Sequence, residues 1–113
     1  MHAIFCPAQI LIRIMRLQPK QIEIIKLHTL DIFGPQAVVR LFGSRLDDAA
    51  LGGDVDLHID SPVPLGSPAL AISRMGAACS RAMWGRKVDV LLSAPGLTEL
   101  PIHRVAKTQG IVL

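Results

Sequence analysis

The sequence predicts a single α+β domain with a mixed β-sheet. Segments whose apolar residues recur at helical spacing alternate along the chain with short runs rich in β-branched residues. Residues 54–60 alternate strictly between polar and apolar side chains, as a strand does when one face packs on the core. The 113 residues suffice for one hydrophobic core rather than two, so we expect no separate large domain for binding an acceptor.

Residues 1–16 form the part of the sequence that predicts least. Apolar side chains run almost continuously from Ile10 to Met15 and fit a buried strand and a helix edge equally well. We interpret residues 1–16 as an N-terminal extension, either ahead of the domain or packed on it, and residues 17–113 as the domain. The extension is too short to span a membrane and lacks the basic start of a signal peptide.

Cysteine usage and charge narrow the class of protein. Cys6 and Cys79 lie far apart and have no metal-ligand spacing with the four histidines, so we expect reduced core thiols and a cytoplasmic location. The net charge of +3 is scattered, and one Trp, three Phe and no Tyr offer little aromatic surface for stacking bases. Nucleic-acid binding is therefore not expected. The apolar composition indicates instead a surface that contacts a protein partner.

The first helix is expected over residues 19–33. Pro19 suits the first helical position, and Gly34 with Pro35 ends the run. Apolar residues recur near helical spacing at Ile22, Ile25, Leu30 and Phe33.

Two strands are expected next. Residues 37–42 form an apolar run rich in β-branched residues, which predicts a buried strand that opens into a tight turn at Gly43 and Ser44. Residues 54–60 predict a half-buried strand. Its core-facing residues are Val55, Leu57 and Ile59.

The second half of the chain predicts a helix, a strand, a shorter helix and a last strand. After a proline-rich loop, these elements are expected over residues 69–83, 87–92, 98–107 and 111–113. The longer helix carries apolar residues at Leu70, Ile72, Met75, Cys79 and Met83.

Asp54 and Asp56 predict a site for a divalent metal. Residues two apart on an extended strand point to the same side, so the two carboxylates face one point and would repel each other without a cation. Mg²⁺ is held by one or two carboxylates together with substrate phosphates. A third carboxylate, Asp89, lies in another expected strand and would allow two ions roughly 3.5–4 Å apart, the arrangement used in phosphoryl and nucleotidyl transfer.

The turn at Gly43 and Ser44 suits a triphosphate. Glycine lets the backbone approach a phosphate closely, and the serine hydroxyl adds a donor beside main-chain N–H groups. Arg45 either neutralises phosphate charge or lies solvated on the surface.

Each of these features has an ordinary structural explanation when taken singly. Alternating acids are often only the wet face of a strand, and Gly-Ser is often only a turn. The combination of the turn, the Asp-x-Asp strand and Asp89 among apolar neighbours favours the metal site, since a charge in an apolar strand needs a reason.

Five other polar or aromatic side chains are expected to play structural roles. We expect His58 and Asp60 to be solvated at the strand, His103 and Arg104 to lie on the surface, and Trp84 to anchor packing.

The stretch Phe-Gly-Ser at 42–44, followed after nine residues by Asp-Val-Asp-Leu at 54–57, resembles the defining motif of the DNA polymerase beta-like nucleotidyltransferase superfamily. Short length, the helix ahead of the first strand and the C-terminal segment resemble its minimal nucleotidyltransferases. Many relatives carry Ser before the first Asp, where this chain has Gly53. The resemblance covers Leu17 to the C-terminus and implies the small nucleotidyltransferase fold, a mixed sheet with helices packed on one side.

The resemblance also implies a set of roles. Gly43 and Ser44 would hold the triphosphate, Asp54 and Asp56 would bind two Mg²⁺ ions, and Asp89 would complete the metal site and act as base. ATP would be the most natural substrate, with AMP transferred. Minimal relatives commonly accompany a small helical HEPN-type protein, and such pairs resemble toxin–antitoxin modules in which a toxin tyrosine is adenylylated.

Two other functions remain open from the sequence. The chain is alternatively a non-catalytic binding module that masks a partner toxin, with the carboxylates vestigial or structural. A third possibility keeps the chemistry but gives it a small-molecule acceptor such as an aminoglycoside, for which no residue pattern marks a pocket.

Overall fold

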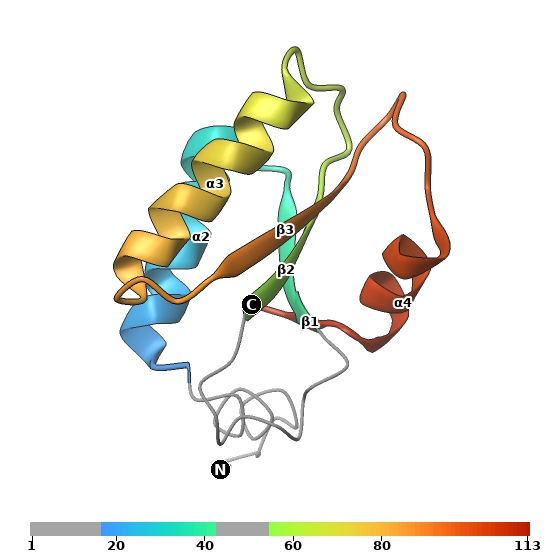
Figure 1. The fold of residues 1–113 in the computed structure, drawn as a ribbon. Coiled ribbons are helices and arrows are strands. Elements are labelled where there is room, and N and C mark those ends of the chain that lie inside the picture. The colour runs from blue at the N-terminus through green and yellow to red at the C-terminus, as the bar shows by residue number, and fades with distance from the viewer. Residues whose placement is uncertain (1–16, 43–54) are drawn as a thin grey trace, which may run out of the picture.

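A computed structural model describes residues 17–42 and 55–113. Within these ranges the chain forms an α+β fold of three helices and a four-stranded mixed sheet (Figure 1). In chain order the elements are α2 (Pro19–Phe33), β1 (Val38–Phe42), β2 (Val55–Asp60), α3 (Pro68–Ala82), β3 (Val88–Ser93), α4 (Pro101–Gln109) and β4 (Ile111–Val112). No helix in the described part of the chain has the length and apolar character needed to cross a membrane.

The strands are ordered β3-β2-β1-β4 in the sheet. β2 pairs with β3 in parallel, whereas β1 runs antiparallel to both β2 and β4. Two parallel strands require a crossover, and α3 supplies it between β2 and β3. Among the described strands, β3 and the short β4 therefore lie at the two edges of the sheet.

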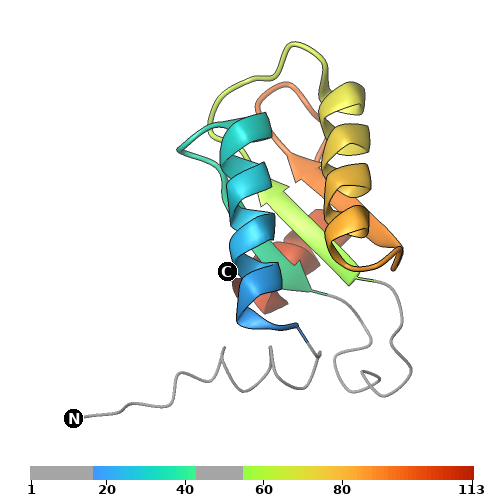
Figure 2. The same ribbon diagram turned by 90° about the vertical axis from the view of Figure 1, so that its left-hand side faces the viewer.

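The main core lies between one face of the sheet and the pair α2 and α3. Figure 2 shows these two helices side by side in front of the strands. Residues 55, 57 and 59 of β2 point into this core, as the strict alternation predicts. The largest fully buried apolar side chains are Ile25, Leu41, Leu57, Ile59, Met75 and Met83.

The inward face of α2 differs from the expected one at a single position. Leu30 is 52% exposed, and Thr29 is buried in its place. The steps from Ile22 through Ile25 and Thr29 to Phe33 are three, four and four residues, which keeps them on one helical face, whereas Leu30 lies about 100° away. The Thr29 hydroxyl donates to the Ile25 carbonyl at 2.8 Å, so its burial leaves no unpaired donor.

Helices cover both faces of the sheet, so the expectation that they pack on one side was wrong. α4 lies opposite α2 and α3, across the strands (Figure 1). Its Ala106 and His103 are buried against the face of β2 that carries His58, a side chain with no exposed surface. The polar alternation of β2 therefore marks a second buried layer rather than a solvated face.

The start of α4 and the state of Cys79 were also predicted from the sequence. α4 begins at Pro101, three residues later than expected. Cys79 is a free, buried thiol, and burial raises its pKa to about 11, as fits an inert core cysteine. Residues 1–16, with Cys6, lie outside the described residues.

Candidate functional site

Asp56 and Asp89 lie side by side on neighbouring strands. They are direct register partners in the parallel pair of β2 and β3. Partners in adjacent strands project from the same face, and the strands run roughly 4.8 Å apart. Both side chains line one cavity of about 400 Å³. The structure thus brings together two of the three predicted carboxylates near the N-terminal ends of these strands.

The other predicted site residues fall outside the described ranges. These are Gly43, Ser44, Arg45 and Asp54. Phe42, the last residue of β1, is the register partner of Asp56 and also lines the cavity. Within residues 17–42 and 55–113, no three His, Cys, Asp or Glu side chains gather closely enough to hold a metal ion.

The environment of Asp89 differs from the expected one. Its side chain is 52% exposed, and the Lys87 ammonium lies 3.8 Å from its carboxylate. Apolar neighbours in sequence suggested an awkwardly placed charge, but β3 is an edge strand and its first half is open to solvent. The argument from charge burial was therefore wrong, and the case for Asp89 rests on its alignment with Asp56.

The wall of the cavity opposite the carboxylates is apolar. α4 contributes Ile102 and Val105, which are 46% and 41% exposed, together with Gln109 at its last position. Phe42 and Leu91 add carbon surface from the sheet. Among the described residues, the lining therefore combines two carboxylates, apolar side chains from the sheet and from α4, and the amide of Gln109.

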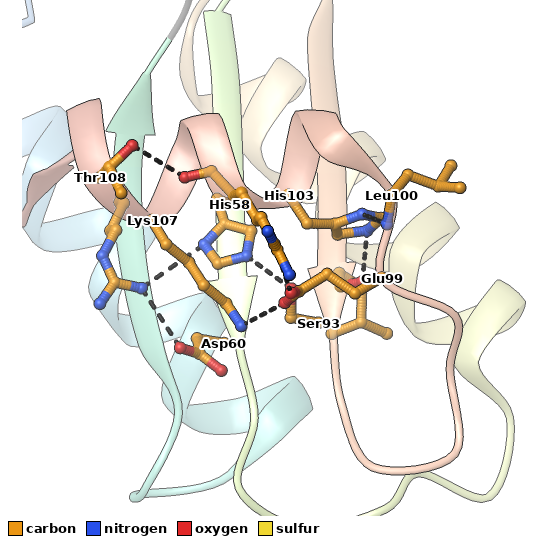
Figure 3. Close-up of polar contacts among 11 residues, drawn as sticks. His58, Asp60, Ser93, Glu99, Leu100, His103, Lys107 and Thr108 are labelled. Carbon is orange, nitrogen blue, oxygen red and sulfur yellow. Dashed lines mark hydrogen bonds and ion pairs between the residues drawn. The ribbon is translucent and has the colours of Figure 1, made fainter.

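His103 attaches the start of α4 to β3. The Leu100 backbone N–H donates to Nδ1 of His103 at 2.9 Å, so the ring proton lies on Nε2, which donates to the Leu92 carbonyl at 3.1 Å (Figure 3). The side chain is buried, and the expectation of a surface position was wrong. One imidazole thus joins the first turn of α4 to the strand that carries Asp89.

His58 is also buried rather than solvated. The distance from Arg40 Nη1 to Nδ1 of His58 is 3.5 Å, and the distance from Nε2 to Ser93 Oγ is 2.8 Å (Figure 3). A guanidinium only donates, so Nδ1 accepts and Nε2–H donates to Ser93. Burial lowers the pKa of His58 to about 4, against the opposing effect of Asp60. His58 is a neutral structural group beneath α4.

The acidic residues at the C-terminal ends of β2 and β3 are paired with cations. Asp60 lies 3.4 Å from Arg40, and Glu99 lies 2.6 Å from Lys107 and 3.5 Å from Arg104. The Lys107 hydrogen bond lowers the pKa of Glu99. Arg104 lies on the surface, as expected. These ion pairs join β1 to β2 and the loop before α4 to α4 itself, so we interpret the cluster as a structural element.

Trp84 does not anchor packing. It is 88% exposed and has a φ of 57°, in the turn between α3 and β3. The turn is held by the Gly85 N–H donating to the Ser80 carbonyl at 2.9 Å and the Ser80 hydroxyl donating to the Arg86 carbonyl at 2.7 Å. Met83, which is fully buried, takes the packing role. Gly85 was the sequence signal for this helix-ending turn.

No protein-family model, no curated protein and no solved structure matches this chain. The similarity to polymerase beta-like nucleotidyltransferases therefore rests on sequence features, chiefly the motif at residues 42–57. What the structure itself establishes is a small α+β domain in which Asp56 and Asp89 line one cavity.

Proposed function

We propose that this protein is a metal-dependent nucleotidyltransferase that moves a nucleoside monophosphate, most simply AMP from ATP, onto a hydroxyl of a partner protein. The observation that carries the proposal is the alignment of Asp56 and Asp89 across two parallel strands, at the wall of an open cavity. The sequence adds Asp54, two residues before Asp56 on the same strand pattern, and the Gly43-Ser44 turn.

The donor set fits Mg²⁺. Carboxylate oxygens are the hard ligands that this ion prefers, and the open cavity leaves room for water and phosphate oxygens in the remaining positions. Asp56 and Asp89, with Asp54 by sequence, would hold the ions, which supply charge neutralisation at the α-phosphate. The Lys87 ion pair to Asp89 is exposed on both sides and therefore weak, so it does not prevent the carboxylate from binding a divalent cation.

The proposed reaction is a single displacement at phosphorus. The acceptor oxygen forms a bond to the α-phosphorus. At the same time, the bond from that phosphorus to the oxygen between the α- and β-phosphates breaks, and pyrophosphate leaves with the electron pair. Asp89 takes the proton of the acceptor hydroxyl. Asp56 would help to hold the metal ion that orients the triphosphate relative to the attacking oxygen.

The partner we propose is a small helical protein of the HEPN type, with this chain as the antitoxin of a cytoplasmic toxin–antitoxin pair. Support comes from the resemblance of the motif at residues 42–57 to minimal nucleotidyltransferases, which commonly accompany a protein of this type. The alternative is a non-catalytic module that inhibits the same partner by covering it. A small-molecule acceptor ranks below both.

Transfer to the partner separates catalysis from masking. The protein is incubated with the product of the adjacent gene, Mg²⁺ and ATP labelled at the α-phosphate, and compared with Asp56→Asn, Asp89→Asn and Asp60→Asn. Asp60 is the matched control, because it lies on the same face of β2 but at the opposite end. Label in the partner with wild type and Asp60→Asn alone supports the proposal. Inhibition of the partner that survives Asp56→Asn and Asp89→Asn without label establishes masking.

Metal binding is tested without any partner. Electron paramagnetic resonance of Mn²⁺, used in place of Mg²⁺, measures the free ion as protein is added. We expect wild type and Asp60→Asn to bind the ion and Asp56→Asn and Asp89→Asn to bind it more weakly. Equal binding by all four proteins contradicts the proposed site.

A further inference from the structure

Trp84 is the most exposed large apolar residue in the described part of the chain and the only tryptophan in the sequence. Its hydrophobic ring system gains most from burial, yet it stands in water. Its backbone also adopts the left-handed conformation that disfavours a bulky side chain. Glycine would relieve both costs at this position. Folding stability therefore does not explain the indole, and a ligand that covers it would.

The turn that carries Trp84 is firmly held. The Met83 N–H donates to the Cys79 carbonyl at 3.1 Å, and the Arg86 N–H donates to the Met83 carbonyl at 3.3 Å. These bonds add to the two that Ser80 makes across the same turn. The Met83 side chain has no exposed surface and fixes the turn in the core. A ligand can therefore bind the indole without first ordering the chain.

The turn is joined to the N-terminal ends of the strands that carry the carboxylates (Figure 2). The N–H of Val55, the first residue of β2, donates to the Lys87 carbonyl at 2.9 Å, and the Lys87 ammonium lies 3.8 Å from Asp89. Trp84 is five residues before Asp89, so their Cα atoms are at most about 17 Å apart. The indole therefore belongs to the same end of the sheet as Asp56 and Asp89.

The strand order sets the direction in which a bound nucleotide would lie. β1 ends at Phe42, directly before the Gly43-Ser44 stretch that we propose for the triphosphate, and β2 separates β1 from β3. With the β- and γ-phosphates towards β1 and the α-phosphate at the carboxylates of β2 and β3, the sugar and base extend beyond β3. Among the described strands β3 is an edge, and the turn of Trp84 leads directly into it.

We propose that Trp84 binds the base of the nucleoside triphosphate by stacking its indole on it. This inference rests on the proposed nucleotidyl transfer. The charge around the indole suits a ligand that joins a flat ring to phosphates. Residues 74–87 contain no Asp or Glu, and their basic side chains are Arg74, Arg81, Arg86 and Lys87. These cations attract the triphosphate towards the turn, while the indole contributes the contact with the base.

Stacking on an indole predicts a preference among nucleotides. Every base has a π face, and the two fused rings of a purine overlap the indole more than the single ring of a pyrimidine does. Two polar groups of the turn, the Ser80 hydroxyl and the Gly85 N–H, already bond within the turn and do not read the edge of a base. We therefore expect ATP and GTP to bind about equally, and CTP and UTP to bind more weakly.

The test uses the fluorescence of the full chain, which reports on Trp84 alone. The protein is titrated in Mg²⁺ with ATP and, separately, with inorganic triphosphate, and calorimetry measures the binding of both ligands. We expect ATP to quench the emission, because the stacked base contacts the indole. Inorganic triphosphate should bind without quenching. N-acetyl-L-tryptophanamide, titrated in parallel, corrects for collisions and for light absorbed by the base.

Substitutions followed by calorimetry provide the second arm. Trp84→Ala is expected to weaken ATP binding about tenfold and to leave binding of inorganic triphosphate unchanged. Trp84→Phe keeps an aromatic face and should recover most of the lost affinity. Leu70→Ala is the matched control, because Leu70 is an exposed apolar residue at the opposite end of α3 and should affect neither ligand. Retained binding of inorganic triphosphate also shows that each variant is folded.

Three outcomes overturn the inference. Trp84 does not bind the base if ATP fails to quench the indole, or if Trp84→Ala binds ATP as tightly as wild type. Equal weakening of ATP and inorganic triphosphate by Trp84→Ala would assign the residue to the shape of the site instead. Any of these results with Mn²⁺ still bound at the carboxylates leaves the proposed function standing. Quenching by ATP without Mn²⁺ bound there defeats the proposed function and retains stacking on Trp84.

Discussion

Acidic side chains lie near both ends of the β2–β3 pair, but their surroundings differ. At the C-terminal ends, Asp60 faces Arg40 and Glu99 faces Lys107, next to the buried hydrogen bond of His58 with Ser93. At the N-terminal ends, Asp56 and Asp89 share an open cavity, and Asp89 is half exposed. Acidic residues thus join neighbouring elements through ion pairs at one end, and at the other end two of them line one cavity side by side.

The largest expected effect is the loss of catalysis when Asp56 or Asp89, at the N-terminal ends of β2 and β3, is replaced. Asp56→Asn or Asp89→Asn is expected to lower nucleotidyl transfer at least about a thousandfold, since each removes a charge that holds the metal, worth several kcal/mol in the transition state. Thermal unfolding should hardly change. Asp60→Asn should do the opposite, with a lower melting temperature and transfer largely retained. Equal loss of transfer in all three variants would remove the distinction between the two ends.

The second effect is a pH dependence of stability that arises from His58, which is hydrogen-bonded to Ser93. The pKa of His58 is about 4 in the folded protein and 6.5 in the unfolded chain, so the unfolded chain binds the proton first as pH falls. The free energy of unfolding is therefore at its full value above pH 6.5 and decreases towards pH 4, by up to about 3 kcal/mol. Urea titrations over this range measure it. His58→Gln should flatten the profile, and an unchanged slope in that variant would assign the dependence to another group.

A smaller effect concerns His103, which joins α4 to β3. His103→Ala removes the hydrogen bonds to Leu100 and Leu92 and is expected to cost about 2 kcal/mol, at roughly 1 kcal/mol for each bond. Because α4 then loses its attachment to β3, the amides of α4 should exchange faster with solvent while Mn²⁺ binding persists. His103→Gln, which keeps a donor and an acceptor, should recover part of the lost stability and of the exchange protection. Loss of Mn²⁺ binding in the alanine variant would show that α4 also positions the carboxylates.

The smallest effect lies in the turn that enters β3. Trp84 adopts a left-handed backbone conformation that a bulky residue adopts at a cost of about 1 kcal/mol or more. Trp84→Gly should raise the free energy of unfolding by about 0.5 kcal/mol after the added flexibility of the unfolded chain is subtracted. Chemical denaturation decides this, with Arg81→Gly, a helical position, as a destabilising control. A loss of stability in Trp84→Gly would mean that the indole makes a contact of its own.

Local patterns predicted the elements well, because they depend on neighbouring residues. The expected helix over 19–33 is α2 at the same bounds, and the alternation of residues 55–60 placed Leu57 and Ile59 in the core. The alternation left open what covers the other face of β2. His58 looked solvated because the helix that buries it, α4, lies some forty residues later and faces it with a histidine and an alanine rather than an apolar stripe.

The candidate site was predictable only in part for the same reason. The Asp-x-Asp pattern located Asp56, and a single carboxylate in a later strand located Asp89, but their alignment depends on the register of β2 with β3, which no short pattern specifies. The apolar neighbours of Asp89 suggested burial because nothing in the sequence marks β3 as an edge strand. Ile102 and Val105 carried no signal at all, since exposed apolar residues on a short helix are common.

The route of the chain through α4 makes assembly of the cavity a cooperative event. α4 connects β3, at one edge of the sheet, to β4, at the other, and crosses β2 and β1 between them. Local opening at the β4 edge would therefore release the C-terminal end of the helix and widen the cavity, while the pairing of Asp56 with Asp89 across β2 and β3 persists. The two walls belong to units of different stability, so amide exchange in α4 should run ahead of exchange in β2.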